Sequence, residues 1–296
     1  MEQFVISSDS TCDLYADYVR ENDIRILSMS YTIEKNGVLT EKKDAFTEYS
    51  QYVDFYNELR GGGFSRTSML NYDEHCKHFE ELVKGGAKQI LHFSLSSGLS
   101  TTAAAAKDAA KDISEKYGCE ILAVDSLAAT IGCGCLVEEA VRMRAAGRDI
   151  REVYDAVSSM TLHVQYAIMV NDLYYLKKGG RVSGAAAAVG TVLNIKPVLS
   201  FTRDGKLTVL EKCKGMKKAF SNTLKRMEKM PPVQEGRMIH IVHNDSPEQA
   251  NELADMIEAR WNFRPQVSIM GPVIGSHVGP DAVSVIWRTE AERNDG

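Results

Sequence analysis

The sequence lacks features that would each indicate a particular class of protein. No run approaches the roughly 18 apolar residues that a membrane helix needs, and the opening Met-Glu-Gln-Phe is not a secretory signal. Basic residues are not in surplus, because 35 lysines and arginines stand against 40 aspartates and glutamates. We therefore expect a cytoplasmic protein with no integral membrane segment, and one whose main partner is not nucleic acid.

Cysteine is present without a recognisable pattern. The six cysteines have no disulfide-framework spacing, which is typical of reduced thiols. The closest pair, Cys133 and Cys135, is one residue tighter than the usual zinc knuckle. His75, Cys76 and His78 form another group on a predicted helix, but no second ligand pair is in sight, and we interpret these histidines as surface residues. The sequence thus predicts no metal site and no cofactor.

Strand-like and helix-like segments alternate in the first half of the 296-residue chain. We predict strands at residues 4–7, 24–30, 89–94 and 121–125, and helices at 47–59, 73–83, 101–116 and 127–146. This order predicts a largely parallel sheet covered by helices, in which ligand sites form beyond the carboxyl ends of strands. Residues 8–13, 94–100 and 125–126 follow predicted strands and therefore lie at that edge.

The pattern changes after about residue 160. We predict strands at residues 162–170, 196–201, 206–211, 238–243, 266–270 and 282–287, and helices at 215–229 and 247–261. Residues 203–206, Arg-Asp-Gly-Lys, are typical of a hairpin turn between two of these strands. We therefore predict an N-terminal α/β domain over 1–160 and a C-terminal α/β domain with a mixed sheet over 161–296.

The most informative segment is residues 91–106, where an apolar strand enters a hydroxyl-rich turn and then an alanine-rich helix. A helix start has unpaired N–H groups and favours negative charge, so the hydroxyl residues around the turn at Gly98 are placed where an anionic group can be held: Ser97, Ser100, Thr101 and Thr102. Serine and threonine are also ordinary N-caps, and helix capping alone explains the segment equally well. The turn matches neither a Walker phosphate loop nor a lipase-type nucleophile elbow.

Small residues and one histidine are the remaining signals. Alanines fill residues 103–106 and recur in 183–190, and such faces either pack very closely or leave space for an apolar ligand. Residues 271–280 surround His277 with glycines and prolines, which predicts a loop of constrained shape that presents the imidazole. Histidine donates to carboxylates and phosphates, although a lone histidine is commonly structural.

Five segments together resemble the DegV family of fatty-acid-binding proteins, which includes the FakB subunits of bacterial fatty acid kinase. They occur in the family's order at residues 8–14 (Ser-Asp-Ser-Thr-Cys-Asp-Leu), 96–100 (Ser-Ser-Gly-Leu-Ser), 176–183, 193–197 and 271–280. The resemblance spans nearly the whole chain. It implies two domains that enclose one long-chain fatty acid, with the carboxylate near the domain junction and the tail in an internal tunnel.

The resemblance also implies roles for individual residues. It maps the carboxylate contacts onto Thr67, Ser100 and His277. Further ligand-binding candidates are Ser68, Ser97 and Gly98, and Arg181 and Lys214 are candidates for the headgroup side or for the partner kinase. In the family a separate kinase subunit phosphorylates the bound acid, so this chain is expected to be a carrier with no catalytic residues of its own.

Two departures from the family pattern lie beside the implied headgroup site. Residues 67–71 are Thr-Ser-Met-Leu-Asn where the family has Thr-Ser-Gln-Pro-Ser, and Thr101 replaces the usual glycine. Both changes affect which ligand is expected rather than whether a carboxylate binds. Two alternatives stay open: a phosphotransfer or hydrolytic enzyme that uses His277 or Ser100, and a sensor of another amphipathic ligand.

Overall fold

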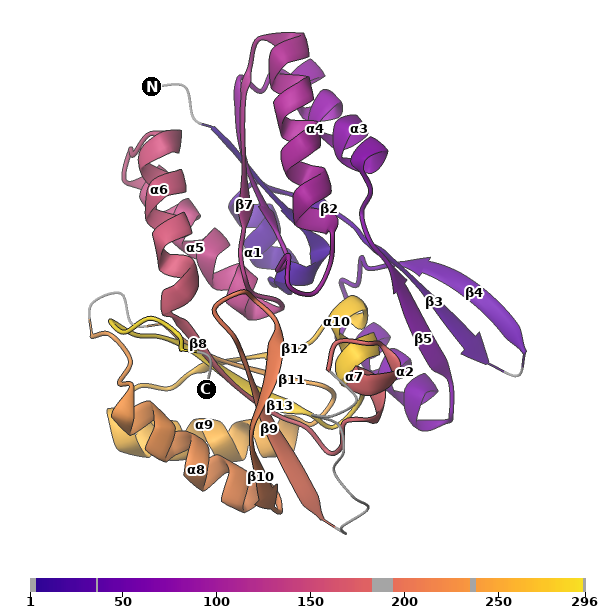
Figure 1. Ribbon diagram of the computed structural model, residues 1–296, viewed down its shortest axis with the longest axis vertical. Helices are drawn as coiled ribbons and strands as arrows, with labels where there is room; N and C mark the ends of the chain where they lie inside the picture. The colour runs from indigo at the N-terminus through magenta and orange to yellow at the C-terminus, as the bar shows by residue number, and fades with distance from the viewer. Residues whose placement is uncertain (1–3, 36, 183–193, 235–237, 295–296) are drawn as a thin grey trace.

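The computed structural model describes residues 4–35, 37–182, 194–234 and 238–294, which form three sheets (Figure 1). Sheet A contains four parallel strands in the order β2-β1-β6-β7. Their bounds are β1 Val5–Asp9, β2 Ile24–Leu27, β6 Gln89–Ser94 and β7 Glu120–Asp125. All four carboxyl ends therefore open at one edge, where the 3-10 helix η1 (Ser10–Cys12) follows β1.

Helices cover both faces of sheet A. On one face are α3 (Tyr72–Lys84) and α4 (Thr102–Tyr117); α5 (Ile131–Ala145) and α6 (Ile150–Met160) pack on the other. The short α1 (Ala16–Glu21) precedes β2. Alanines of α4 pack closely with Phe79 and Ile90, and Ala103 to Ala106 are absent from the cavity described below. Within the first alanine run, Ala106 belongs to this packed cluster whereas Ala104 is exposed; the run at 183–190 lies outside the described residues.

Sheet C follows residue 160 and has the order β10-β9-β8-β13-β11-β12, with antiparallel neighbours except for the parallel pair β11 and β12. Its strands are β8 Val164–Met169, β9 Ile195–Phe201, β10 Leu207–Lys214, β11 Ile239–His243, β12 Gln266–Ile269 and β13 Val283–Arg288. The 3-10 helix η2 (Thr161–His163) precedes β8, and helices α8 (Met216–Lys229) and α9 (Pro247–Trp261) pack on one face. The parallel and mixed sheets confirm the predicted α/β class, and the hairpin at 203–206 is confirmed; the boundary at residue 160 stays a prediction.

A third, smaller sheet was not predicted. Sheet B has the antiparallel order β4-β3-β5, with β3 Ser30–Lys35, β4 Val38–Lys43 and β5 Phe64–Ser68. Its neighbours are α2 (Tyr49–Arg60) and two short helices from the second half of the chain, α7 (Tyr174–Lys178) and α10 (Pro272–Val278). This sheet therefore brings residues near position 67 against residues near position 277.

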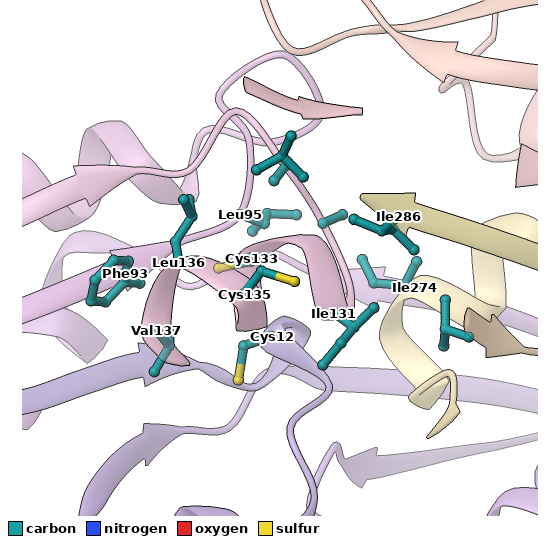
Figure 2. Packing of buried hydrophobic residues seen from close by; sticks show 14 of the residues in the cluster. Cys12, Phe93, Leu95, Ile131, Cys133, Cys135, Leu136, Val137, Ile274 and Ile286 are labelled. Atoms are coloured by element: carbon teal, nitrogen blue, oxygen red, sulfur yellow. The ribbon is translucent and has the colours of Figure 1, made fainter. Parts of the chain in front are cut away.

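One apolar core joins the sheets. Figure 2 shows Ile131 and Cys133 of α5 between Phe93 from sheet A and Ile286 from sheet C. The first turns of α5 are buried on all sides, which is the pattern of a helix inside a core. A Cβ on Gly132 would overlap the Tyr166 hydroxyl, so glycine allows α5 to approach sheet C.

Several sequence predictions of helices and strands were wrong. The predicted strand 24–30 divides between β2 and β3, which belong to different sheets. The helix predicted from residue 127 begins at 131, because Leu127 and Thr130 adopt positive φ angles of 47° and 54°. Helix α6 was not predicted.

Within the described residues, no helix has the length and apolar character to cross a membrane.

The histidines of α3 were also misplaced. His75 is fully buried, and His78 is partly buried with its Nε2 2.7 Å from Ser7 Oγ. Ser7 Oγ also lies 3.0 Å from His92 Nδ1. Hydrogen bonds to this serine of β1 therefore hold the imidazoles of His78 and His92 between α3 and sheet A. Burial lowers the pKa of His78 to about 4. The prediction of surface histidines was wrong because it did not consider hydrogen-bond partners on sheet A, such as the Ser7 hydroxyl.

Candidate functional site

An apolar cavity lies where the three sheets meet. Of its 20 lining residues, 13 are aliphatic or thioether side chains or Phe201, and the polar ones include Thr67, Ser100, Arg181 and His277. The lining surrounds about 740 Å³ of space free of protein atoms, part of it open to solvent. The centre of a water molecule can reach only about 70 Å³ of it. The space therefore suits a slender apolar molecule better than a bulky ring.

The polar corner of this cavity, defined as Thr67, Ser100, Arg181 and His277, comes from four separate segments. Thr67 Oγ1 and His277 Nε2 are 2.8 Å apart and form a hydrogen bond between β5 and α10. One residue before His277, Ser276 Oγ donates to Ser65 Oγ at 2.6 Å, and Ser65 shares its face of β5 with Thr67. The strand and the helix are thus joined twice, which fixes the position of the imidazole.

His277 is held in its neutral form. Burial, with the positive charge of Arg181 as a smaller cause, lowers the pKa of His277 to about 4. Among the described residues, no hydrogen-bond partner lies near its buried Nδ1, although the ring packs against Gly179, where a Cβ would overlap it. Arg181 Nη1 donates to the Gly179 carbonyl at 2.5 Å. A neutral imidazole next to a guanidinium forms a corner that favours an anionic ligand group.

Ser100 lines the cavity and also forms a hydrogen bond at the start of α4. Its hydroxyl lies 2.9 Å from Thr102 Oγ1 and accepts from the Thr102 N–H at 3.3 Å, while the residue lines the cavity. Ser100 therefore accepts from the first N–H of α4 and also lines the cavity, while its contact with a ligand stays a prediction. Thr101 Oγ1 donates to Met69 Sδ at 2.8 Å, so the two departures from the family pattern contact each other.

The other predicted residues lie outside the lining. Ser68 is exposed on the opposite side of β5 from Thr67, as strand alternation requires, and Lys214 is exposed at the end of β10. The Ser97 N–H donates to Asp125 Oδ1 at 3.1 Å. Gly98 packs against the turn of the β9–β10 hairpin, where a Cβ would lie 2.6 Å from the Asp204 carbonyl oxygen. The structure thus gives Ser97 and Gly98 a place in loop packing.

Sequence reasoning missed the two aspartates that position the polar corner. Asp9 Oδ2 accepts from the Leu95 N–H at 2.8 Å and so holds the loop that carries Ser100. Asp13 Oδ1 accepts from the Gly271 N–H at 3.1 Å and so holds the start of α10, while Asp13 Oδ2 accepts from Thr130 Oγ1. The signal was present, because Asp9 ends β1 of a parallel sheet and Asp13 follows shortly after it.

Burial also changes the acidity of this pair. It raises the pKa of Asp9 to about 6 and that of Asp13 to about 7, against the lowering effect of their hydrogen bonds. Asp44, whose Oδ2 accepts from Ser10 Oγ at 2.9 Å, has its pKa raised well above the ordinary value by the same cause. These buried carboxyl groups therefore take up protons at a higher pH than exposed carboxyl groups do.

The opposite side of the cavity is made by regular strands of sheet C. Tyr166 and Ile168 come from β8 and Phe201 from β9, and the Tyr166 and Phe201 ring centroids are 4.5 Å apart. Behind them, buried Arg293 lies with its guanidinium carbon 5.7 Å from each ring centroid and donates to the Leu127 carbonyl at 3.0 Å. We call Tyr166, Ile168 and Phe201 the apolar wall.

A second hollow lies beyond Asp13 and Asp44. It surrounds about 1100 Å³ of space free of protein atoms, is more open to solvent than the first cavity, and includes Arg20 and Arg25 in its lining. It contains no residue of the polar corner. The first cavity is therefore the better candidate for a ligand with one polar and one apolar end.

Known proteins of similar sequence and structure share one family. The family model that matches residues 3–290 describes an uncharacterised protein of the DegV family. A DegV domain-containing protein of Clostridium perfringens is 35% identical, over 97% of this chain and 98% of that protein.

Solved structures resemble the fold over almost its full length. A DegV lipid-binding protein from Thermotoga maritima is 26% identical with a TM-score of 0.83, covering 98% of this chain and 100% of that chain. A DegV family protein from Thermus thermophilus, described by its fatty acid binding, is 25% identical with a TM-score of 0.81, covering 97% of this chain and 99% of that chain. These likenesses extend over both α/β units rather than over one of them.

Proposed function

The chain belongs to the DegV family, and from this premise we propose that it binds one long-chain fatty acid in the cavity. The carboxylate is held in the polar corner by Thr67, Ser100 and His277, and the tail lies along the apolar wall. The observation that carries this proposal is a narrow apolar cavity with a single polar corner built around a buried, neutral imidazole. Relatives described as lipid-binding or fatty-acid-binding support the same class of ligand.

The energetics assign affinity and orientation to different parts of the ligand. Each buried methylene contributes roughly 0.8 kcal/mol, so about fourteen of them contribute roughly 11 kcal/mol before ordering costs. The tail alone can therefore supply the affinity. The headgroup contacts then set which end of the molecule stays in the polar corner, for which neutral donors are sufficient.

Arg181 has a separate place in the proposal. Its guanidinium is partly exposed and bonded to the Gly179 carbonyl, so it is near the carboxylate while remaining accessible from outside. We propose that the protein presents the carboxylate to a separate kinase, which makes the acyl phosphate, and that Arg181 contacts the kinase or the new phosphate. This chain then acts as a carrier and supplies no catalytic residue.

Native mass spectrometry and lipid extraction of the purified protein test the binding step. We expect one fatty acid per chain, and we expect added fatty acid to raise the Tm of the delipidated protein. A protein that co-purifies with no fatty acid and shows no Tm change with any chain length contradicts the proposal. A sterol or another amphipath in the extract would favour a sensor of that ligand instead.

Labelled ATP tests the carrier role. Incubation of the protein with labelled ATP and fatty acid should give no labelled product until a fatty acid kinase subunit is added. Label that appears on His277 or Ser100 with ATP alone would identify this chain as the phosphotransfer enzyme.

A further inference from the structure

A cluster of three metal-ligating side chains lies between the two α/β units, apart from the cavity. Cys135 and Glu138 are on α5, and His240 is on β11 of sheet C. Cys135 Sγ, a Glu138 carboxylate oxygen and a His240 ring nitrogen all lie within 4.8 Å of one another. None of these residues lines the cavity, so the proposed fatty acid site leaves them unexplained.

The distances within the cluster fit two ligands that share an ion. His240 Nε2 and Glu138 Oε2 are 3.4 Å apart. That is longer than a charge-assisted hydrogen bond of about 2.7–2.9 Å. It equals the edge of a tetrahedron around zinc, which is about 3.4 Å for metal–ligand bonds of about 2.1 Å.

The three side chains lie on regular elements, α5 and β11, and the cluster is exposed to solvent mainly at Glu138. Cys135 and Glu138 are three residues apart and so face the same side of α5. His240 lies on a strand with a neighbour on each side, β13 and β12. Cys135 is fully buried and the His240 side chain is 9% exposed, whereas Glu138 is 23% exposed. An ion can therefore enter past the glutamate and reach a thiol held inside the core.

We propose that Cys135, Glu138 and His240 form a zinc-binding site that joins α5 to sheet C. A thiolate, an imidazole and a carboxylate are ligands that zinc accepts together, and a water from the exposed side can complete the tetrahedron. On binding, the thiol releases its proton to solvent and its sulfur lone pair bonds to the ion. The ion holds α5, whose first turn follows the cavity residues Ala129 and Thr130, against the second sheet.

Cobalt spectroscopy on the full-length, reduced, chelator-treated protein tests this site. Added Co²⁺ should give a sulfur-to-cobalt charge-transfer band with the strong visible bands of four-coordinate cobalt, and Zn²⁺ should remove both. The band should be lost in Cys135→Ser and kept in Cys133→Ser, a matched control because Cys133 is equally buried on the same helix. No band in the unaltered protein, or a band that survives Cys135→Ser, overturns the proposal.

A milder variant covers the case in which Cys135→Ser does not fold. Glu138→Gln keeps the size of a partly exposed side chain and should weaken Zn²⁺ binding at least tenfold by competition with a chromophoric chelator. Zn²⁺ should also raise the Tm of the unaltered protein by about 5 °C, and less in Glu138→Gln. Equal affinities in the two proteins overturn the site. Fatty acid binding is measured separately and does not depend on this result.

Discussion

The polar corner and the apolar wall of the cavity are built in different ways. Thr67, Ser100 and His277 come from a small sheet, a loop and a short helix, and they meet through hydrogen bonds that Asp9 and Asp13 anchor. The apolar wall comes from the alternation of two regular strands of sheet C. The apolar wall thus follows from strand periodicity, whereas the polar corner requires segments that are distant in sequence.

The largest expected effect comes from filling the apolar wall. Ile168→Trp places an indole in the narrow cavity and should weaken fatty acid binding by at least about 50-fold, the equivalent of three excluded methylenes. Isothermal titration of the delipidated protein measures this. Leu39→Trp, on the exposed β4, is the control and should bind normally. Normal affinity in Ile168→Trp would place the tail elsewhere.

Loss of an anchor of the polar corner should come next. Asp13→Ala leaves the Gly271 N–H and the Thr130 hydroxyl without their partner and should lower the free energy of unfolding by about 2 kcal/mol. Asp13→Asn should lose less, because burial raises the pKa of Asp13 to about 7 and an amide oxygen can still accept. Urea unfolding at neutral pH compares them. Equal loss in both variants would show that charge, and not geometry, is what Asp13 supplies.

The free energy of unfolding should depend on pH because His277 is buried in its neutral form. The pKa of His277 is about 4 in the folded protein, against about 6.5 when unfolded, so the unfolded chain takes up the proton first. The contribution of neutral His277 to the free energy of unfolding is present above pH 6.5 and is lost as the pH falls towards 4. Compared with His277→Gln, the unaltered ligand-free protein should lose about 2 kcal/mol more across this window. Parallel unfolding curves would contradict a buried neutral His277.

Single headgroup contacts should matter less than the tail. Thr67→Val removes the hydroxyl that bonds His277 while keeping the shape of the side chain, and should weaken fatty acid binding about tenfold. Ser68→Ala is the matched control on the exposed side of β5 and should bind normally. Displacement of a fluorescent fatty acid measures both. An equal effect of the two substitutions would remove Thr67 from the polar corner.

The smallest effect on binding is expected for Arg181→Ala. The guanidinium is partly exposed and already bonded to the Gly179 carbonyl, so affinity should change less than about threefold. Acyl phosphate formation with an added kinase subunit should fall much more. A large loss of fatty acid affinity would instead make Arg181 a direct ligand of the carboxylate.

Local patterns predicted the regular parts of the fold well. The strands of sheet C and the hairpin at 203–206 follow from apolar alternation and from turn residues with Gly205 at a positive φ of 73°. The segment around His277 was predicted as a loop, yet Pro272 begins α10, a position where proline favours a helix start. The glycines in this segment favoured the prediction of a loop, although Pro272 indicated a helix start.

Other features were beyond local patterns. The turn from β2 to β3 moves the chain between sheets, and nothing in residues 24–30 marks the change because both halves are strand-like. His75 and His78 resemble exposed residues until Ser7 and His92 face them across α3 and sheet A.

The α/β class, the two kinds of main sheet and the family resemblance follow from the amino-acid sequence alone, because strand and helix periods and motif order are local properties of the chain. Only the tertiary structure decided that Thr67 meets His277, that Asp9 and Asp13 hold the corner, and that Gly98 packs against a hairpin. It also placed the Cys135 thiol within 4.8 Å of a His240 ring nitrogen on β11. A side chain's chemistry depends on the atoms around it, and in this protein those atoms come from segments up to 258 positions away in the sequence.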